Sequence, residues 1–442
     1  MTFNEIDKTG RIKNEKAKGH LGQIIEESFF EYEINSNKEA DFKELGIELK
    51  VTPIKKNKNG TLSAKERLVL NIINYEDEYK LQFDSSSFWS KNKKLLMMFY
   101  HWTKGVPRKD YPIIEVYLHN YSKSDLEIIK QDWNYIIQKI KDGKAHELSE
   151  GDTTYLGAVT KGASKGSLRS QPFNELPAMQ RAFSLKQSYM TALVRQLIDK
   201  EDLISIATKE DLSKLTLEEV IQSKFQPYFG KTVNQISEDY NISFNPKAKN
   251  FVHQFISLLL DLPTIQLNKI EEFQKANIVP KTIRLEPNGK PEQNMSFHNI
   301  DFNEWAYNDW EDSEWREYFE ATKFLFFIFE YKEKTEDNKN RELYFKGLKL
   351  WNMPESMIES ELYIFWKKVR NIINNGIKIK RVKHGKYYRN NNNLPKASEE
   401  SYFHLRPKGR DGKDIVVLPD GQEITKQCFW FNRDFVVDII NQ

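Results

Sequence analysis

A long internal repeat is the feature that most constrains the fold of this chain. Residues 41–52 (DFKELGIELKVT) align without a gap to residues 272–283 (EFQKANIVPKTI), at an offset of 231 (272 − 41). Residues 16–25 match residues 247–256 at the same offset (247 − 16), and later matches follow at 233 (Trp366 − Trp133) and 247 (Lys408 − Lys161). A similarity that keeps its order over roughly two hundred residues indicates a duplicated domain.

The second copy carries an insertion. The offset grows by 14 (247 − 233) between Gly376 and Lys408, and the Lys-, Arg- and Asn-rich residues 381–396 are the candidate segment. Apolar residues alternate with basic ones from Ile377 to Val382. This alternation predicts an edge strand with a lysine-rich solvent face, while DNA contact there is the less favoured interpretation.

Hydrophobic periodicity predicts an α+β architecture with mixed β-sheets. Helices are predicted over residues 22–32, 125–143, 177–199 and 217–222, and strands over residues 47–53, 68–75, 95–100 and 113–118. Trp305, Trp310 and Trp315, as well as Met97 and Met98, are expected in the core. At 442 residues the chain has room for two domains. We predict a catalytic domain at residues 1–200, a linker at 201–215 and a second domain at 216–442.

The first copy contains a candidate metal site. In an extended strand over residues 46–52, Glu48 and Lys50 point to one face and the apolar residues between them to the other. Asp41 lies seven residues before Glu48 (48 − 41), where a turn could return its carboxylate to the strand. Two carboxylates and an ammonium on one face can hold a hard divalent cation beside a scissile phosphate. The bare spacing would arise by chance in roughly one such chain in four, and the alternative is a solvated strand face with an ordinary ion pair.

The second copy has lost acidic residues at two positions. Under the offset of 231 (272 − 41), Ser257 stands in place of Glu26, and Val279 stands in place of Glu48. Two further positions keep their chemical type, with Lys281 for Lys50 and Glu272 for Asp41. Because Mg²⁺ needs anionic oxygen ligands, the second copy should bind it poorly. The first copy is therefore predicted to be catalytic and the second to be a binding domain on the same fold.

The first copy resembles the mismatch-repair nicking endonuclease MutH and the related GATC-specific type II restriction endonucleases. Residues 18–26, 45–53, 90–96, 132–133 and 155–168 carry the resemblance, which covers nearly all of residues 10–197 and, more faintly, residues 216–442. The degenerate second copy is similar to the two-domain restriction enzymes, whereas the mismatch-repair protein has one copy. The resemblance implies two tandem restriction-endonuclease-like, PD-(D/E)xK domains, with mixed β-sheets flanked by helices.

The resemblance also implies roles for individual residues of the first copy. Asp41 and Glu48 would bind the metal together with the carbonyl of Leu49, and Lys50 would orient the attacking water or help to deprotonate it. Glu26 matches an additional acidic residue of the site. A further family lysine falls in residues 90–95, where Lys93 is predicted and Lys91 is the alternative.

Candidate DNA-binding residues lie in both copies. They are Lys18, Lys161 and Lys186 in the first copy and Arg406 and Lys408 in the second. The family's Arg-Pro-Lys triplet is Val-Thr-Lys at residues 159–161 but Arg-Pro-Lys at residues 406–408, which suggests that the second copy has kept a DNA-reading element. The net charge of +3 requires binding through local basic clusters rather than bulk charge.

Composition excludes several other classes. The single cysteine, Cys428, excludes an intramolecular disulfide framework, and the N-terminus lacks the apolar core of a signal peptide. Apolar runs are too short to span a bilayer, so we expect a cytoplasmic protein without a membrane partner. The eight histidines show no zinc-ligand spacing, and no phosphate-binding loop for ATP occurs.

Together these patterns predict a Mg²⁺-dependent type II restriction endonuclease that cuts double-stranded DNA. The GATC site and cutting 5′ of the G are implied by the resemblance alone. The second copy is expected to bind a second GATC site and activate the first, or to pair chains as a homodimer on DNA. A strand-nicking mismatch-repair enzyme and a non-catalytic DNA-binding regulator are the alternatives. The duplication argues against the first, and the intact Asp41, Glu48 and Lys50 argue against the second.

Overall fold

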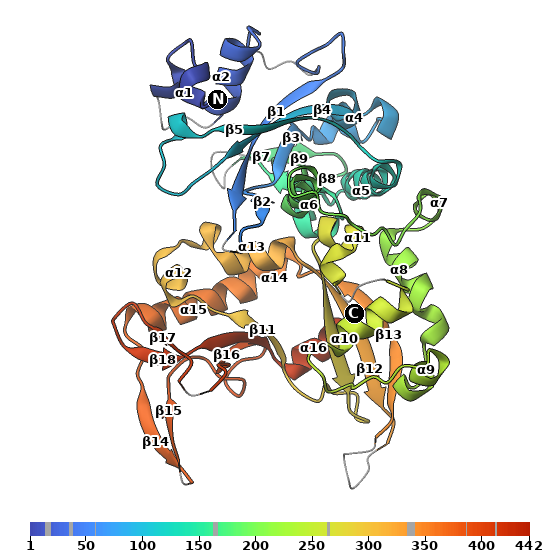
Figure 1. Ribbon diagram of the computed structural model, residues 1–442, viewed down its shortest axis with the longest axis vertical. Coiled ribbons are helices and arrows are strands. Elements are labelled where there is room, and N and C mark those ends of the chain that lie inside the picture. Colours follow the sequence, from blue (N-terminus) through green and yellow to red (C-terminus); the bar gives the residue numbers. More distant parts are fainter. Residues whose placement is uncertain are drawn as a thin grey trace. The chain divides into compact units, whose positions relative to one another are not determined.

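A computed structural model describes residues 1–13, 19–34, 39–57, 59–161, 167–262, 266–333, 341–385, 387–411 and 413–442. The chain forms two compact units, Met1–Val220 with Gln266–Ile278, and Ile221–Ile265 with Val279–Gln442. Both units mix helices with β-sheets (Figure 1), which confirms the α+β prediction. Residues 201–215, predicted as a linker, fall within the first unit. The assignment of a catalytic and a DNA-binding domain to the two units stays a prediction.

The main sheet of the first unit has the strand order β2-β1-β4-β5. Its strands are β1 (Glu48–Lys56), β2 (Leu62–Ala64), β4 (Lys94–His101) and β5 (Ile113–Asn120). The strands β1 and β4 run parallel, and the other neighbours pair antiparallel. Leu49 and Val51 of β1 pack with Leu96 and Met98 of β4 in one apolar cluster. Strand alternation therefore directs Glu48 and Lys50 away from that cluster, as predicted.

A second, three-stranded sheet of the first unit has the order β3-β9-β6. It consists of β3 (Leu68–Ile72), β6 (Leu156–Thr160) and β9 (Arg181–Leu185), and a hairpin of β7 (Leu168–Gln171) and β8 (Asn174–Met179) precedes β9. The helix predicted over residues 177–199 is therefore wrong in its first half, because α6 occupies only Gln187–Leu197. Antiparallel pairing of β9 with β3 and β6 overrides the helix propensity of the local sequence.

The long helix of the first unit is α5 (Lys123–Lys141), and its remaining helices are shorter than α6. They are α1 (Phe3–Ile6), α2 (His20–Ile24), α3 (Tyr75–Glu78), α4 (Ser87–Asn92), α7 (Lys209–Leu212) and α11 (Glu271–Lys275), with the π-helix η2 (Ile25–Phe29). The helix α8 (Leu217–Phe225) crosses into the range of the second unit. In the part of the chain that is described, none of the helices combines the length and the apolar character needed to span a bilayer.

The second unit repeats the strand order of the first. One sheet has the order β10-β12-β13 and the other β11-β19-β16. Their strands are β10 (Ile278–Leu285), β12 (Lys323–Tyr331), β13 (Leu343–Trp351), β11 (Met295–Asn299), β16 (Phe403–Pro407) and β19 (Gln427–Phe431). The offsets between the two copies align β10, β12 and β13 with β1, β4 and β5, and β19 and β16 with β9 and β6, while β11 takes the place of β3 in the strand order. The duplication is thus present in the topology as well as in the sequence.

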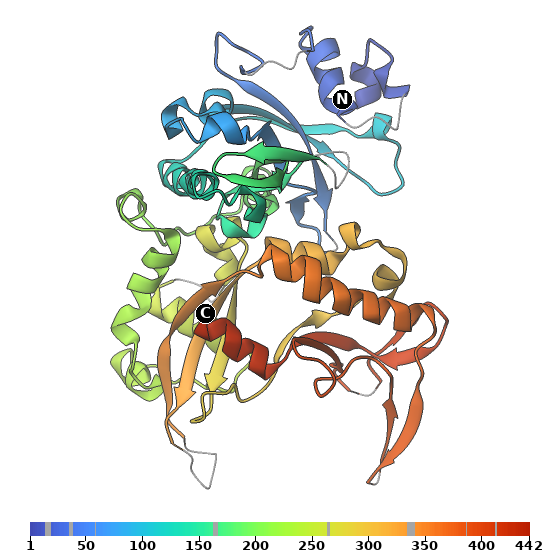
Figure 2. The same ribbon diagram turned by 180° about the vertical axis from the view of Figure 1, so that it is seen from behind.

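Helix α15 (Tyr363–Asn374) packs over the β11-β19-β16 sheet (Figure 2). Its Phe365 contacts Phe403 of β16 and Phe429 of β19. The other helices of the second unit are α9 (Val233–Asp239), α10 (Phe251–Leu259), α12 (Phe302–Tyr307), α13 (Glu314–Ala321), α14 (Glu355–Met357), the π-helix η10 (Ile358–Leu362) and α16 (Arg433–Asn441). Short single-turn 3₁₀ helices are η1 (Arg11–Lys13), η3 (Phe83–Ser85), η4 (Arg108–Asp110), η5 (Ala145–Glu147), η6 (Glu150–Asp152), η7 (Gln226–Tyr228), η8 (Leu267–Lys269) and η9 (Trp310–Asp312).

Several local predictions about the core and the insertion are confirmed. Met97 and Met98 are buried, as are the three tryptophans of the acidic segment. The strand expected in the insertion is β14 (Lys380–His384), which pairs antiparallel with β15 (Tyr387–Asn391). This hairpin projects from the body of the second unit in both views (Figures 1 and 2). A further small hairpin joins β17 (Ile415–Val417) to β18 (Glu423–Thr425).

Candidate active site

A tight turn before β1 returns Asp41 to the strand. The backbone N–H of Phe42 donates to the carbonyl of Ile47 at 2.9 Å, and the N–H of Ile47 donates back to Phe42 at 3.3 Å. Gly46 closes the turn with a φ of 61°, in the left-handed region that glycine adopts without strain. The predicted return of the chain is therefore a hydrogen-bonded hairpin.

The hairpin places the two candidate ligands side by side. The Asp41 carboxylate accepts a hydrogen bond from the N–H of Leu49 at 2.9 Å, measured to Oδ2. In return, the N–H of Asp41 donates to Oε2 of Glu48 at 3.3 Å. Because each carboxylate contacts the backbone beside the other, their separation is set by the β-hairpin rather than by free side-chain rotation.

Glu48 is a buried carboxylate with two lysine partners. Its side chain is in the interior of the unit, and Oε1 lies 2.7 Å from Nζ of Lys50 and 3.6 Å from Nζ of Lys91. Burial raises the pKa of Glu48, and the Lys50 ammonium opposes that rise. The two ammonium groups offset the cost of a charge that would otherwise be isolated from water.

Glu26 adds a third carboxylate to this group. It lies on the π-helix η2, a kind of helical irregularity that is frequent at functional sites. Burial raises the pKa of Glu26, the negative charge of Asp41 raises it further, and the charge of Lys50 opposes both effects. The three carboxylates therefore repel one another, and a bound cation would relieve that repulsion.

The donor chemistry of the site fits a hard divalent cation. In the described part of the chain, no three side chains among His, Cys, Asp and Glu are arranged to hold a metal by themselves. Asp41 and Glu48, together with the carbonyl of Leu49, could supply three oxygen ligands, and water would fill the remaining positions. Mg²⁺ is commonly bound in this way, through one or two carboxylates and several waters.

The two candidate lysines, Lys91 within α4 and Lys93 directly after it, lie in different places. Lys93 follows the last residue of α4, and its Cε would stand 2.9 Å from a Cβ placed on Gly46, so the side chain packs against the turn. Lys91 instead reaches the Glu48 carboxylate. The geometry therefore favours Lys91, whereas the sequence favoured Lys93. The end of α4 decides which of the two lysines reaches Glu48. The spacing of residues in the motif does not reveal where the helix ends.

The predicted DNA-binding residues of the first unit are not equivalent. Lys18 lies outside the described residues. Lys161 is exposed directly after β6, and its N–H donates to the carbonyl of Gln180 at 2.7 Å. Lys186 is only 3% exposed, and its ammonium donates to the carbonyl of Thr153. The structure does not support the DNA contact predicted for Lys186, because a buried ammonium with a backbone partner does not face a phosphate.

The buried ammonium of Lys186 interacts electrostatically with the buried carboxylate of Asp132. The Asp132 carboxylate accepts hydrogen bonds from the N–H groups of Thr154, Tyr155 and Leu156 at 2.6, 2.6 and 2.9 Å. Burial raises the pKa of Asp132, and the hydrogen bonds from these N–H groups and the charge of Lys186 oppose that rise. The motif at residues 132–133 therefore anchors the start of β6 to α5. It is not part of the cluster formed by the Glu26, Asp41 and Glu48 carboxylates.

The second unit has different chemistry at the equivalent positions. Lys281, the counterpart of Lys50, donates to the carbonyl of Ser296 at 3.0 Å, and Val279 occupies the position of Glu48. Glu272, the counterpart of Asp41, belongs to the first unit, where it accepts hydrogen bonds from the N–H groups of Ile206 and Ala207. The Glu272 carboxylate thus anchors the backbone at residues 206–207. In the described residues, no pair of carboxylates equivalent to Asp41 and Glu48 is formed.

Arg406 and Lys408 both lie beside Trp430. The Arg406 guanidinium is 5.5 Å and the Lys408 ammonium 5.4 Å from the centre of the indole, and both residues are exposed. Lys408 also donates to Oγ of Ser296 at 2.7 Å. The two predicted DNA-binding residues of the second unit are therefore brought together on one aromatic surface.

Comparison with known proteins identifies relatives of both parts of the chain. The family model described as DNA mismatch repair enzyme MutH matches residues 30–132. The type II restriction enzyme Sau3AI of Staphylococcus aureus is 36% identical over 470 residues, covering 98% of this chain and 94% of that enzyme. The DNA mismatch repair protein MutH of Shewanella amazonensis is 27% identical over 188 residues, covering 42% of this chain and 81% of its own length. MutH of Haemophilus ducreyi is 24% identical over 194 residues.

The carboxylate geometry predicts that Asp41 is needed for binding a divalent cation. Asp41→Asn should weaken Mn²⁺ binding about tenfold or more, because it removes one anionic ligand of the site. Glu44→Gln is the matched control, since Glu44 is an exposed carboxylate in the same turn. Calorimetric titration of both variants with Mn²⁺ measures the difference. Equal affinities in the two variants would show that the Asp41 carboxylate is not a ligand.

Proposed function

Because the chain belongs to the family of the type II restriction enzyme Sau3AI, we propose that it cuts double-stranded DNA at GATC sequences, 5′ of the G, with Mg²⁺ as its cofactor. The family makes the chain a site-specific deoxyribonuclease whose N-terminal region is MutH-like. The proposal is carried by one observation: the Asp41 and Glu48 carboxylates converge beside Lys50 at the start of β1, inside the region that the MutH model matches.

Hydrolysis of a phosphodiester requires an activated water and relief of the charge that develops on the phosphoryl oxygens. When bound, Mg²⁺ lowers the pKa of its water and neutralises part of that charge. The hairpin before β1 holds the Asp41 and Glu48 carboxylates in the positions from which they would bind the ion. The Lys50 ammonium, now 2.7 Å from Glu48 Oε1, is positioned to orient the attacking water or to stabilise the phosphorane. Lys91 supplies a second positive charge at the same carboxylate.

The second unit is proposed to be an effector domain that binds a second GATC site. It keeps the fold and the Arg-Pro-Lys triplet at residues 406–408, but lacks the carboxylate that corresponds to Glu48. A domain of this kind can bind DNA without cutting it. Cutting both strands requires two active sites or rebinding, so pairing of two chains on the DNA belongs to the same proposal.

A strand-nicking activity of the mismatch-repair type is the second candidate, because two MutH proteins are among the relatives. The match to each of these two MutH proteins covers 42% of this chain, whereas the match to Sau3AI covers 98% of this chain. Sau3AI, whose match spans both copies, is a restriction enzyme. Double-strand breaks are therefore the favoured product, and an excess of nicks over breaks would support the second candidate.

The proposed chemistry predicts that Glu48→Ala abolishes cleavage but keeps DNA binding. Cleavage of GATC-bearing plasmid in Mg²⁺ should fall about a thousandfold or more, because the metal loses an anionic ligand. Affinity for a GATC duplex in Ca²⁺ should remain within about threefold of wild type, since Glu48 would contact the metal rather than the bases. Mapping the cut ends of the wild-type products tests the site. Cuts elsewhere would remove GATC from the proposal, and loss of specific binding in Glu48→Ala would contradict the ligand role.

The positions of the two lysines predict a difference between matched variants. Lys91→Ala should reduce kcat about 100-fold, because its charge lies at the Glu48 carboxylate, whereas Lys93→Ala should change kcat less than about threefold. Single-turnover cleavage of a GATC duplex under saturating enzyme separates this effect from binding. The reverse order of the two rates would assign the role to Lys93.

The effector proposal predicts a dependence on the number of sites. Plasmid with several GATC sites should be cut about tenfold faster per site than plasmid with one, in the range typical of coupling between two binding sites. A short GATC duplex added in trans should restore the rate on the one-site plasmid. Equal rates per site, unaffected by added duplex, would refute an effector role for the second unit.

A further inference from the structure

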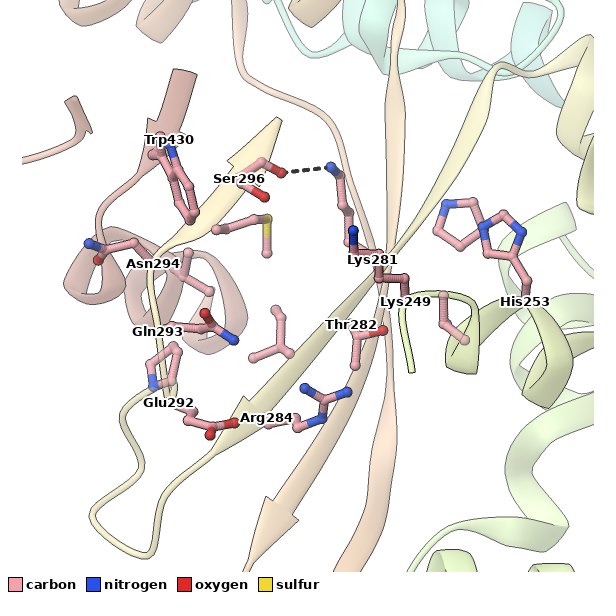
Figure 3. A pocket seen from close by; sticks show the side chains of 16 residues that line it. Lys249, His253, Lys281, Thr282, Arg284, Glu292, Gln293, Asn294, Ser296 and Trp430 are labelled. Atoms are coloured by element: carbon pink, nitrogen blue, oxygen red, sulfur yellow. Dashed lines mark hydrogen bonds between the residues drawn. The ribbon is translucent and has the colours of Figure 1, made fainter. Parts of the chain in front are cut away.

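The second unit contains a cavity of about 340 Å³ that is lined by β10, the following loop and α10. Figure 3 shows Lys249, Lys281 and Arg284 on its walls, with Ser296 and Trp430 at one end and Glu292 beside Arg284 at the other. In the sequence alignment, β10 corresponds to β1, the strand that carries the carboxylates of the first unit. The cavity therefore lies at the position in the fold where the first copy has its active site.

The charge of this cavity is the opposite of that in the first copy. Three cationic side chains and one carboxylate, Glu292, are among its lining residues. Lys281 has neutral partners, because its ammonium donates to the carbonyl of Ser296 at 3.0 Å and lies 4.5 Å from the centre of the Phe297 ring. Lys50, its counterpart, contacts the Glu48 carboxylate at 2.7 Å. An ammonium that had a carboxylate partner in the first copy thus faces neutral groups in the second.

A second ammonium lies next to Lys281. Lys408 donates to Oγ of Ser296 at 2.7 Å, while Lys281 donates to the carbonyl oxygen of the same residue. Burial and, as a smaller effect, the charge of Lys408 together lower the pKa of Lys281 to about 8. Two cations held on one serine repel each other, and an anion bound between them would relieve that repulsion.

Arg284 provides a donor at the other end of the cavity. Its guanidinium donates through Nη2 to the carbonyl of Pro246, and in the described residues its buried Nε has no hydrogen-bond partner. A buried N–H group without an acceptor is costly, so an acceptor supplied by a ligand would be favourable. The cavity thus offers ammonium and guanidinium donors, the combination by which proteins commonly bind phosphate.

We propose that this cavity is a phosphate-binding site, and that its occupant is a backbone phosphodiester of the DNA bound by the second unit. This inference rests on the proposed effector function. The ammonium of Lys281, the counterpart of Lys50, would contact the phosphate, and Lys408 beside Trp430 would contact the same strand. Without a pair of carboxylates to position a metal and its water, the phosphate is bound and not hydrolysed.

Competitive acetylation of lysines tests the proposal on the full chain, in the Glu48→Ala background and without metal. Near pH 8, the acetylation rate of Lys281 is compared with that of Lys346, an exposed lysine of β13 that pairs with Glu330. Inorganic phosphate should slow acetylation of Lys281 about fivefold or more relative to chloride at equal ionic strength, and a GATC duplex should do the same. Acetylation of Lys346 should not change with either ligand.

Each other result overturns part or all of the proposal. An unchanged Lys281 rate in phosphate would show that the cavity does not recognise the phosphate group. Protection by phosphate without protection by the duplex would show that the occupant is free phosphate and not DNA. Protection by both, together with wild-type cleavage that does not respond to a second GATC site, would uphold the phosphate site and refute the effector function.

A charge-removing variant supplies a second measurement. Lys281→Gln should weaken binding of the second GATC duplex about tenfold and lower the slope of log K against log salt by about one, because one phosphate contact is lost. Binding of the first duplex should be unchanged, and Lys346→Gln should change neither event. A Lys281→Gln chain with the wild-type salt slope would contradict the proposal.

Discussion

The hydrogen bond from the N–H of Leu49 to the Asp41 carboxylate is the interaction on which the candidate active site depends. It closes the hairpin of residues 42–47 and fixes two carboxylates on one edge of β1. Because Glu48 is buried, its charge must be offset, and the nearby ammonium groups of Lys50 and Lys91 do so. The requirements of this one buried charge thus account for the acidic and basic residues that surround the start of the strand.

The second copy has the same strand order as the first but different side-chain chemistry at the position of the candidate active site. Its sheets repeat the strand order of the first, and an aromatic core of residues such as Phe365, Phe403 and Phe429 supports them. The replacement of Glu48 by Val279 leaves the ammonium of Lys281 facing neutral groups. A few substitutions on a retained fold therefore turn a site for a cation into a site with surplus positive charge, in keeping with the general separation of fold and function.

The sequence predicted most of what depends on local pattern. Strand alternation and a turn before Glu48 were enough to anticipate the approach of Asp41, and the ordered matches between the two copies anticipated the repeated topology. The segment at residues 177–185 was wrongly predicted as helix, because pairing of β9 with two distant strands decides its conformation. The contact of Lys91, rather than Lys93, with Glu48 depends on where α4 ends, and the burial of Lys186 depends on Asp132, 54 residues earlier (186 − 132). Such contacts follow from packing and are not encoded in any single motif.

At equivalent positions the two copies differ in charge, with carboxylates in the first and lysine and arginine side chains in the second. Anomalous diffraction from crystals of the full chain soaked in Mn²⁺ would show this difference, because it locates the ion in each unit. We expect a peak beside Asp41, Glu48 and the carbonyl of Leu49, and no peak in the cavity lined by Lys249, Lys281 and Arg284. A peak in that cavity, or an empty site beside Asp41 and Glu48, would contradict it.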